Sequence, residues 1–196
     1  MHDPSVPVPT CDSYLIALGA NMPSQAGPPR AALHSALDAL GAAGARAQSV
    51  SSFYHTPCFP PGAGPDYVNA AARIAFEGTP QDLLALLHEV EARFGRTRAE
   101  RWGQRVLDLD LIAAGNHILP DPQTVQAWLD LPLEAQKTRA PEALILPHPR
   151  LQDRAFVLVP LADVAPDWRH PVLGQTVLEM CAGLPASARA EVRLLD

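Results

Sequence analysis

The chain has 196 residues, of which 47% are hydrophobic and 18% charged, so its composition is that of a soluble globular protein with enough apolar surface for one core. A formal net charge of −6 argues against a general nucleic-acid binder, and no apolar run is long enough to cross a membrane. Residues 1–12 are proline-rich and lack the basic and apolar regions of a signal peptide. We therefore expect a flexible tail over 1–12, a single domain over 13–196 and a cytoplasmic protein.

Elements with regular hydrophobic spacing follow one another along residues 14–113. Apolar or alternating runs predict strands over 14–18, 46–54, 67–76 and 106–113, with a proline- and glycine-rich loop over 56–66. Helical spacing predicts helices over 28–43 and 79–94, the second with Thr79 as its N-cap, Pro80 in its first turn and Gly95 after its end. Farther along the chain, short helices are expected around 125–129, 155–164 and 175–182.

The order strand, helix, strand, strand, helix, strand is typical of ferredoxin-like α+β folds. We therefore predict an antiparallel sheet with two helices on one face. The opposite face is expected to be open, and the active site is expected to lie there.

The strand predicted over 106–113 carries two carboxylates on one face. Leucines at 107, 109 and 111 point into the helix-covered core, so Asp108 and Asp110 point to the open face, roughly 7 Å apart. Such a pair repels itself unless a cation lies beside it, and Mg²⁺ prefers carboxylate and phosphate oxygens. An ordinary polar strand face exposed to water is the alternative interpretation of the two aspartates alone.

Arginines are concentrated just before this strand, although the whole chain is acidic. The cluster indicates a local anion site, and a solvated charged surface is the alternative. The chain has neither a Walker A loop nor a kinase-type glycine loop, so side chains and metal would have to bind any phosphate. The clustered residues are Arg93, Arg96, Arg98, Arg101 and Arg105.

Several longer motifs occur together and in one order over roughly residues 13–172. In these motifs the sequence resembles the 6-hydroxymethyl-7,8-dihydropterin pyrophosphokinases of folate biosynthesis. The arginine-to-aspartate motif and the histidine–proline element are specific in combination. The matching segments are Leu18-Gly-Ala-Asn21, Ser51-Ser-Phe-Tyr-His-Thr-Pro57, Pro65-Asp-Tyr-Val-Asn-Ala-Ala71, Gly95-Arg-Thr-Arg98, Arg101-Trp-Gly-Gln-Arg-Val-Leu-Asp-Leu-Asp110 and Pro147-His-Pro-Arg-Leu-Gln-Asp-Arg-Ala-Phe156.

The resemblance implies transfer of a pyrophosphoryl group from ATP to the pterin hydroxymethyl group, with release of AMP. Asp108 and Asp110 would be catalytic residues that hold two Mg²⁺ ions on the triphosphate. Arg96 and Arg105 would also be catalytic, by pairing with phosphate oxygens. Leu111 and Ile145 would contact ATP through backbone atoms. The remaining ATP-binding residues would be Arg98, His148 and Arg154.

The pterin is a flat bicycle that suits stacking between rings and a few directed hydrogen bonds. The resemblance implies that Trp102 and Phe156 stack on it. The amide of Asn69 would bind its pyrimidine edge. The pocket would be lined by Thr56, Pro57 and Tyr67.

Two other classes of function compete with the enzyme. A small-ligand sensor also fits a ferredoxin-like fold, but it does not require paired aspartates beside an arginine-rich loop. RNA binding is disfavoured by the acidic charge and by the lack of an aromatic platform on the central strands. We therefore expect ATP and hydroxymethyldihydropterin as the partners, no nucleic acid or membrane, and a monomer.

Overall fold

The computed structural model describes residues 13–58, 64–95, 106–132, 135, 139 and 141–195. Four of the predicted site residues, Arg96, Arg98, Trp102 and Arg105, lie outside the described residues, as does the predicted N-terminal tail. Within the described ranges, no helix is both long enough and apolar enough to cross a membrane.

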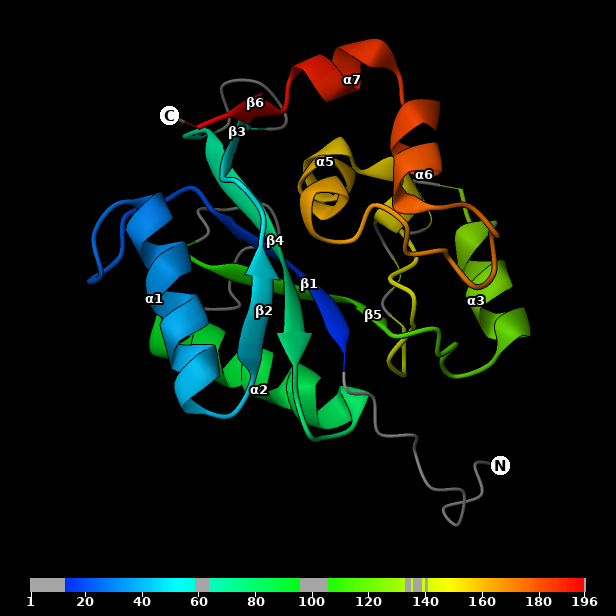
Figure 1. Ribbon diagram of the computed structural model, residues 1–196, viewed down its shortest axis with the longest axis horizontal. Coiled ribbons are helices and arrows are strands. Elements are labelled where there is room, and N and C mark those ends of the chain that lie inside the picture. Colours follow the sequence, from blue (N-terminus) through cyan, green and yellow to red (C-terminus); the bar gives the residue numbers. More distant parts are fainter. Residues whose placement is uncertain are drawn as a thin grey trace.

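The centre of the protein is an antiparallel sheet (Figure 1). Its strand order is β5-β1-β4-β3-β6, and β2 also pairs with β4. The long central strand β1 pairs with both β4 and β5, so β5 lies at an edge. The strands are β1 (Tyr14–Ala20), β2 (Arg46–Val50), β3 (Tyr54–Thr56), β4 (Tyr67–Ala75), β5 (Asp108–Ala114) and β6 (Arg193–Leu194).

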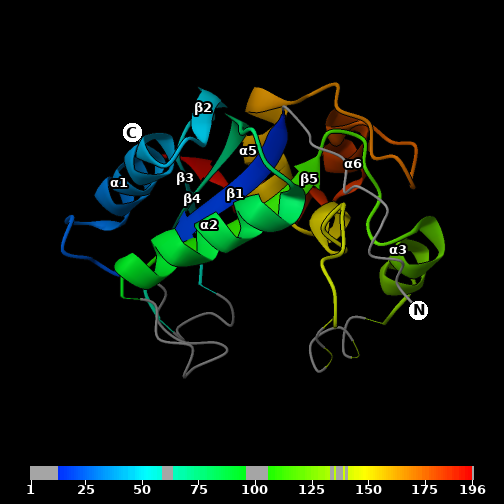
Figure 2. The same cartoon turned by 90° about the horizontal axis from the view of Figure 1, so that it is seen from below.

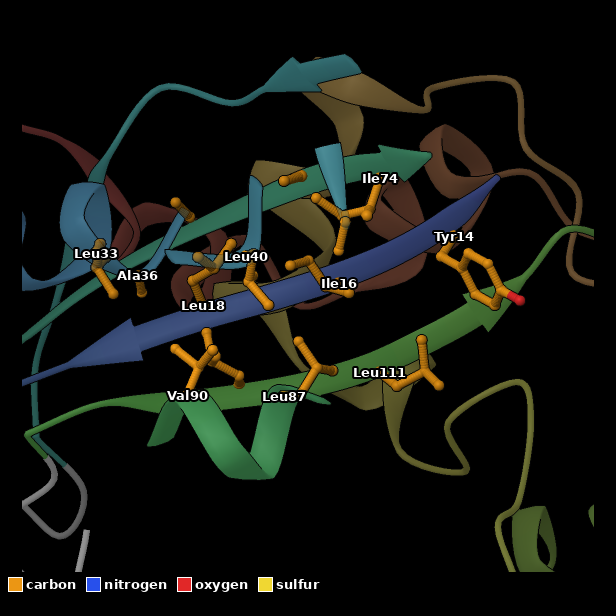
Figure 3. Close-up of a cluster of buried hydrophobic side chains, with 14 of the residues drawn as sticks. Tyr14, Ile16, Leu18, Leu33, Ala36, Leu40, Ile74, Leu87, Val90 and Leu111 are labelled. Carbon is orange, nitrogen blue, oxygen red and sulfur yellow. The ribbon is translucent and has the colours of Figure 1, made fainter. Parts of the chain in front are cut away.

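Helices α1 (Pro29–Ala42) and α2 (Pro80–Arg93) cover one face of the sheet (Figure 2). As predicted, Thr79 caps α2, and it shares a capping box with Asp82. Gly95 follows the helix with φ +85°, a conformation that favours glycine. Apolar side chains from these two helices and from β1, β4 and β5 converge in one core (Figure 3), which includes Ile16, Leu18, Leu33, Leu40, Ile74, Leu87, Val90 and Leu111.

The opposite face of the sheet is less open than the sequence predicted. Helix α5 (Ala155–Val164) packs against β4 there and forms a second apolar layer with parts of β1 and β5. This layer includes Ala17 of β1, Ala71 of β4 and Val157 of α5. The physical reason is that α5 has apolar residues all round, so its burial requires a partner surface. The ferredoxin-like α+β class is confirmed, and on this face Asp108 and Asp110 of β5 remain partly exposed.

The strand predicted over 46–54 is in fact two strands. Ser51 interrupts the run, because its hydroxyl accepts a hydrogen bond from the Ala71 N–H at 2.9 Å. The next N–H, that of Ser52, donates to Asp163 of α5 instead of to a neighbouring strand. Thr56, expected to begin a loop, is consequently the last residue of β3.

The C-terminal half contains short elements, some of which the sequence did not predict. Helix α3 (Pro122–Leu129) begins earlier than expected, because Asp121 caps it by accepting from the Thr124 N–H. A 3₁₀ turn, η1 (Leu151–Asp153), precedes α5, and α6 (Val177–Gly183) matches the helix expected over 175–182. The elements not predicted are η1, α7 (Ala186–Ala190) and β6.

Candidate active site

One row of residues crosses the sheet and joins the two halves of the predicted site. In the strand registers, Asp108 lies opposite Gly19, Gly19 opposite Asn69, and Asn69 opposite Tyr54. Residues directly opposite one another in antiparallel strands have side chains on the same face. Asp108 and Asn69 therefore lie on one face of the sheet, with only a glycine between them.

The two aspartates lie as predicted on the face opposite the leucines of β5. Leu107, Leu109 and Leu111 are buried in the helix-covered core, whereas Asp108 and Asp110 are half-buried. Oδ1 of Asp108 is shielded from solvent. Among the residues that the structure describes, no group of three or more His, Cys, Asp or Glu side chains could hold a metal ion, so the described carboxylates offer a two-residue site.

A buried carboxylate of α2 supports the strand between the two aspartates. Oε1 of Glu91 accepts a hydrogen bond of 2.7 Å from the backbone N–H of Leu109. Glu91 is only 2% exposed. The bond satisfies an N–H of the edge strand and ties β5 to α2 at the point where Asp108 and Asp110 leave the backbone.

The segment 145–154 runs beside the free edge of β5. The N–H of His148 donates to the carbonyl of Ile112 at 2.8 Å, which anchors the histidine to the strand. Nη1 of Arg154 lies 3.6 Å from Oδ2 of Asp110. The Arg154 guanidinium also lies 5.7 Å from the ring centre of Phe156. The structure thus brings Asp110, His148, Arg154 and Phe156 together.

The His148 ring is fixed as a neutral hydrogen-bond donor. Its Nδ1 accepts from the N–H of Arg150 at 3.1 Å, so in the neutral ring the proton is on Nε2. Burial and, to a smaller extent, the charges of Arg154 and Arg150 together lower the pKa of His148 to about 3, against smaller opposing effects of a backbone hydrogen bond and of Asp108. At neutral pH the Nε2–H can therefore donate to an anion, while Nδ1 remains occupied.

The pterin half of the predicted site is built on β3 and β4. Nδ2 of Asn69 donates to Oγ1 of Thr56 at 2.6 Å, and both residues are buried. This bond leaves Oδ1 of Asn69 as the acceptor on the side of Gly19, where a Cβ atom would lie 2.9 Å from it. Tyr67, opposite Thr56 in the register, completes the group.

Polar contacts hold the two ends of the loop between β3 and β4. The Cys58 N–H donates to Oδ1 of Asp66 at 3.1 Å, and His55 Nε2 lies 3.1 Å from the other oxygen of the same carboxylate. Nδ2 of Asn21 donates to the carbonyl of Pro65 at 3.1 Å. Both loop ends are thereby fixed beside Thr56 and the end of β1.

Comparisons with known proteins identify the family and the fold. Residues 15–166 match the model of the family described as 7,8-dihydro-6-hydroxymethylpterin-pyrophosphokinase. A 2-amino-4-hydroxy-6-hydroxymethyldihydropteridine pyrophosphokinase of Synechocystis is 36% identical over 91% of this chain and 79% of its own length. The protein of the same name from Pseudomonas aeruginosa is 37% identical over 87% of this chain and 90% of its own length.

The chain belongs to the dihydropterin pyrophosphokinase family. The fold agrees with a solved structure, the Plasmodium falciparum HPPK-DHPS with pteroate. That structure matches 91% of this chain and 45% of the longer one with a TM-score of 0.63 at 13% identity. The protein is accordingly a transferase that moves a pyrophosphoryl group to hydroxymethyldihydropterin in folate synthesis.

The other predicted site residues of this pyrophosphokinase differ in how far their side chains are exposed. The side chains of Leu111 and Ile145 are buried, which leaves only their backbone for contact with a ligand. Pro57 is exposed at the end of β3, and Tyr67 is half-buried. Phe156 is 41% exposed at the start of α5, which leaves its ring accessible for stacking.

Sequence reasoning missed three residues that shape the site. Gly19 and Arg150 lie inside the matching motifs. The signal for Gly19 was a glycine within a predicted buried strand, and the signal for Arg150 was a second cation close to His148. Glu91 was not singled out, although a glutamate among the apolar residues of a core-facing helix is itself a signal.

Proposed function

We propose that the row from Asp108 to Asn69 is where ATP and the pterin meet. The single observation that supports this most directly is the register that joins the two residues through Gly19. A carboxylate pair at one end of the row suits the metal–triphosphate group. A fixed amide at the other end suits the heterocycle.

Asp108 and Asp110 fit Mg²⁺, with two ions as the expected number. Mg²⁺ is commonly held by one or two carboxylates together with substrate phosphates and waters, and the described site offers two carboxylates. When bound there, Mg²⁺ supplies positive charge that neutralises the triphosphate and the developing transition state. Glu91, through Leu109, fixes the backbone from which the two carboxylates project.

The phosphates of ATP are assigned to the cationic side of this pair. Arg154 is close enough to Asp110 to reach the same ligand, and its planar guanidinium can donate to two oxygens at once. His148 donates one hydrogen bond from Nε2 without adding a charge. Arg96, Arg98 and Arg105 are proposed, from the family motif, to complete the phosphate site, with Arg96 and Arg105 acting on the transferred group.

The pterin is assigned to the surface beside Gly19 and Asn69. The Asn69 carbonyl oxygen, held by Thr56, accepts from an N–H on the pyrimidine edge. Trp102 and Phe156 are proposed to stack on the bicycle. Pro57 and Tyr67 form walls, and Leu111 and Ile145 contact the nucleotide through their backbone.

The reaction follows from this placement. The pterin hydroxyl oxygen forms a bond to the β-phosphorus, and the bond from that phosphorus to the oxygen bridging to the α-phosphate breaks. AMP leaves and the hydroxyl proton is released. We assign no side chain as general base, because catalysis by positioning and charge stabilisation suffices for this class of transfer.

Four broader proposals accompany the mechanism. The chain acts as one pyrophosphokinase domain over 13–196. It works as a monomer. It acts in the cytoplasm. It does not bind nucleic acid, which agrees with a net charge of −6.

The test identifies the products that receive a label from ATP. Enzyme, Mg²⁺, the pterin and ATP labelled at the γ-phosphorus are mixed, and the products are separated. We expect the label on the pterin and an equal amount of AMP. Accumulation of ADP with a singly phosphorylated pterin would show attack at the γ-phosphorus and refute the proposal.

A further inference from the structure

Arg150 is a cation beside the site that the roles above leave unused. The backbone N–H of Arg150 donates a hydrogen bond to the ring of His148. The Arg150 side chain is half-buried, and the residue lies between His148 and Arg154 in the sequence. Its Nε is shielded from solvent and has no hydrogen-bond partner within the described ranges. A shielded N–H donor without a partner is costly, so its retention calls for an explanation.

The guanidinium groups of Arg150 and Arg154 repel each other. Burial lowers the pKa of Arg150, and the charge of Arg154 lowers it further, while Asp153 partly offsets both effects. Arg154 has the carboxylate of Asp110 at 3.6 Å. In the part of the chain that the structure describes, Arg150 forms no comparable ion pair within 4.0 Å.

These contacts define a group of hydrogen-bond donors with a net positive charge. It comprises two arginines and a neutral histidine whose free N–H is on Nε2. Without a ligand, the two arginine charges oppose each other. A polyanion placed between them would relieve this repulsion and give the Arg150 fork the acceptors that it lacks.

We propose that Arg150 is a second phosphate-binding arginine, which donates to a phosphate oxygen of ATP beside Arg154 and His148. This inference rests on the proposed placement of the ATP phosphates at His148 and Arg154. It adds Arg150 to that site, a residue to which the motif match gave no role. The substrate class is the triphosphate of the nucleotide and not the pterin.

A purely structural role for Arg150 can be separated from this one. The bond to the His148 ring comes from the Arg150 backbone, so it survives replacement of the side chain. Arg150→Gln removes the charge and shortens the side chain, and Arg150→Lys keeps the charge but loses the fork. Arg46→Gln is a matched control, because Arg46 is exposed opposite Ala75, at the end of β4 away from Asn69.

The experiment measures binding of an ATP analogue with a methylene group between the α- and β-phosphorus atoms, in the presence of Mg²⁺, by calorimetry. We expect Arg150→Gln to bind it roughly tenfold or more weakly, the lysine variant to be intermediate and Arg46→Gln to match the original protein. The melting temperature of ligand-free Arg150→Gln should be unchanged or higher, because repulsion is removed. Pterin affinity should not change.

Equal nucleotide affinity in Arg150→Gln and Arg46→Gln would overturn the proposal. So would a lower melting temperature with parallel losses of nucleotide and pterin affinity, since that result means a general loss of site structure. Arg154→Gln separates the two levels of inference. If it binds the nucleotide normally, the phosphate placement itself is wrong, whereas a loss in Arg154→Gln alone refutes only the role of Arg150.

Discussion

The absence of a side chain at Gly19 is predicted to be a requirement for pterin binding. A Cβ atom at this position would lie 2.9 Å from Oδ1 of Asn69, so the amide would have to move. The amide is held by Thr56 at 2.6 Å, and moving it strains or breaks that bond. Gly19 is not among the positive-φ glycines, so alanine is compatible with the backbone and the contact with Asn69 dominates.

The size of the effect follows from these contacts. A net hydrogen bond contributes about 0.5–1.5 kcal/mol, and overpacking in a well-packed site costs about 1–3 kcal/mol. If about 1–2 kcal/mol of this falls on pterin binding, KM for the pterin rises by roughly 5–30-fold in Gly19→Ala. KM for ATP should change little. Gly41→Ala is the control, because a Cβ there meets nothing within 4 Å.

A double-mutant cycle in steady-state kinetics decides whether the added methyl group acts through Asn69. In an Asn69→Ala background the methyl group has no amide to displace, so Gly19→Ala should have little further effect on pterin KM. If Gly19→Ala raises the pterin KM by the same factor in both backgrounds, the reasoning is refuted. The same conclusion would follow if Gly19→Ala raised the KM values for ATP and pterin equally.

Three other predictions concern the aspartates, the α2 carboxylate and pH. Asp110→Asn should lower turnover by more than the roughly 10–100-fold typical of an outer-shell partner. Its melting temperature should stay close to normal, because a partly exposed, 3.6 Å ion pair contributes about 1 kcal/mol or less. Near-normal turnover at saturating Mg²⁺ would contradict the metal assignment. Glu91→Ala should lower the unfolding free energy by about 1–3 kcal/mol and raise the Mg²⁺ concentration needed for activity. Glu91→Gln keeps an acceptor for the Leu109 N–H, so its loss of unfolding free energy in denaturant titrations should be smaller. Equal losses in the two variants would argue against the bond to the Leu109 backbone. The pKa values of His148 and His170 are lowered, mainly by burial, to about 3 and about 4. As the pH falls, both histidines therefore bind protons at a higher pH in the unfolded chain than in the folded one. The unfolding free energy should fall as pH drops from 8 to 5, by about 2 kcal/mol for each histidine. An equally steep pH dependence in the His148→Asn/His170→Asn double variant would show that other groups cause it.

The sequence predicted the parts of the fold that follow local rules. Thr79, Pro80 and Gly95 marked the ends of α2 because caps and positive φ depend on neighbouring residues alone. Alternation placed Leu109 and Asp110 on opposite faces of β5 for the same reason. The family motif identified His148 and Arg154, and the structure places both beside the aspartates.

Three of the failures involve contacts between distant segments. The break between β2 and β3 depends on Asp163, more than a hundred residues away, which binds the Ser52 N–H. The layer formed by α5 requires small residues such as Ala17 and Ala71 beneath it, and their purpose is visible only in three dimensions. The role of Glu91 likewise depends on its contact with β5, 18 residues later.

The second apolar layer explains how the fold can accommodate a site with unfavourable charges before ligands bind. Like charges lie close together twice, as the pair Asp108 and Asp110 on β5 and as the pair Arg150 and Arg154 beside it. Each pair opposes folding, and the contact between Arg154 and Asp110, 3.6 Å long and partly exposed, is too weak to offset both. The compensation comes from buried surface on both sides of the sheet: the core of α1 and α2 on one face and α5 on the other. Because binding of a dication and a polyanion removes both repulsions together, Mg²⁺ and nucleotide should stabilise the fold far more jointly than either does alone.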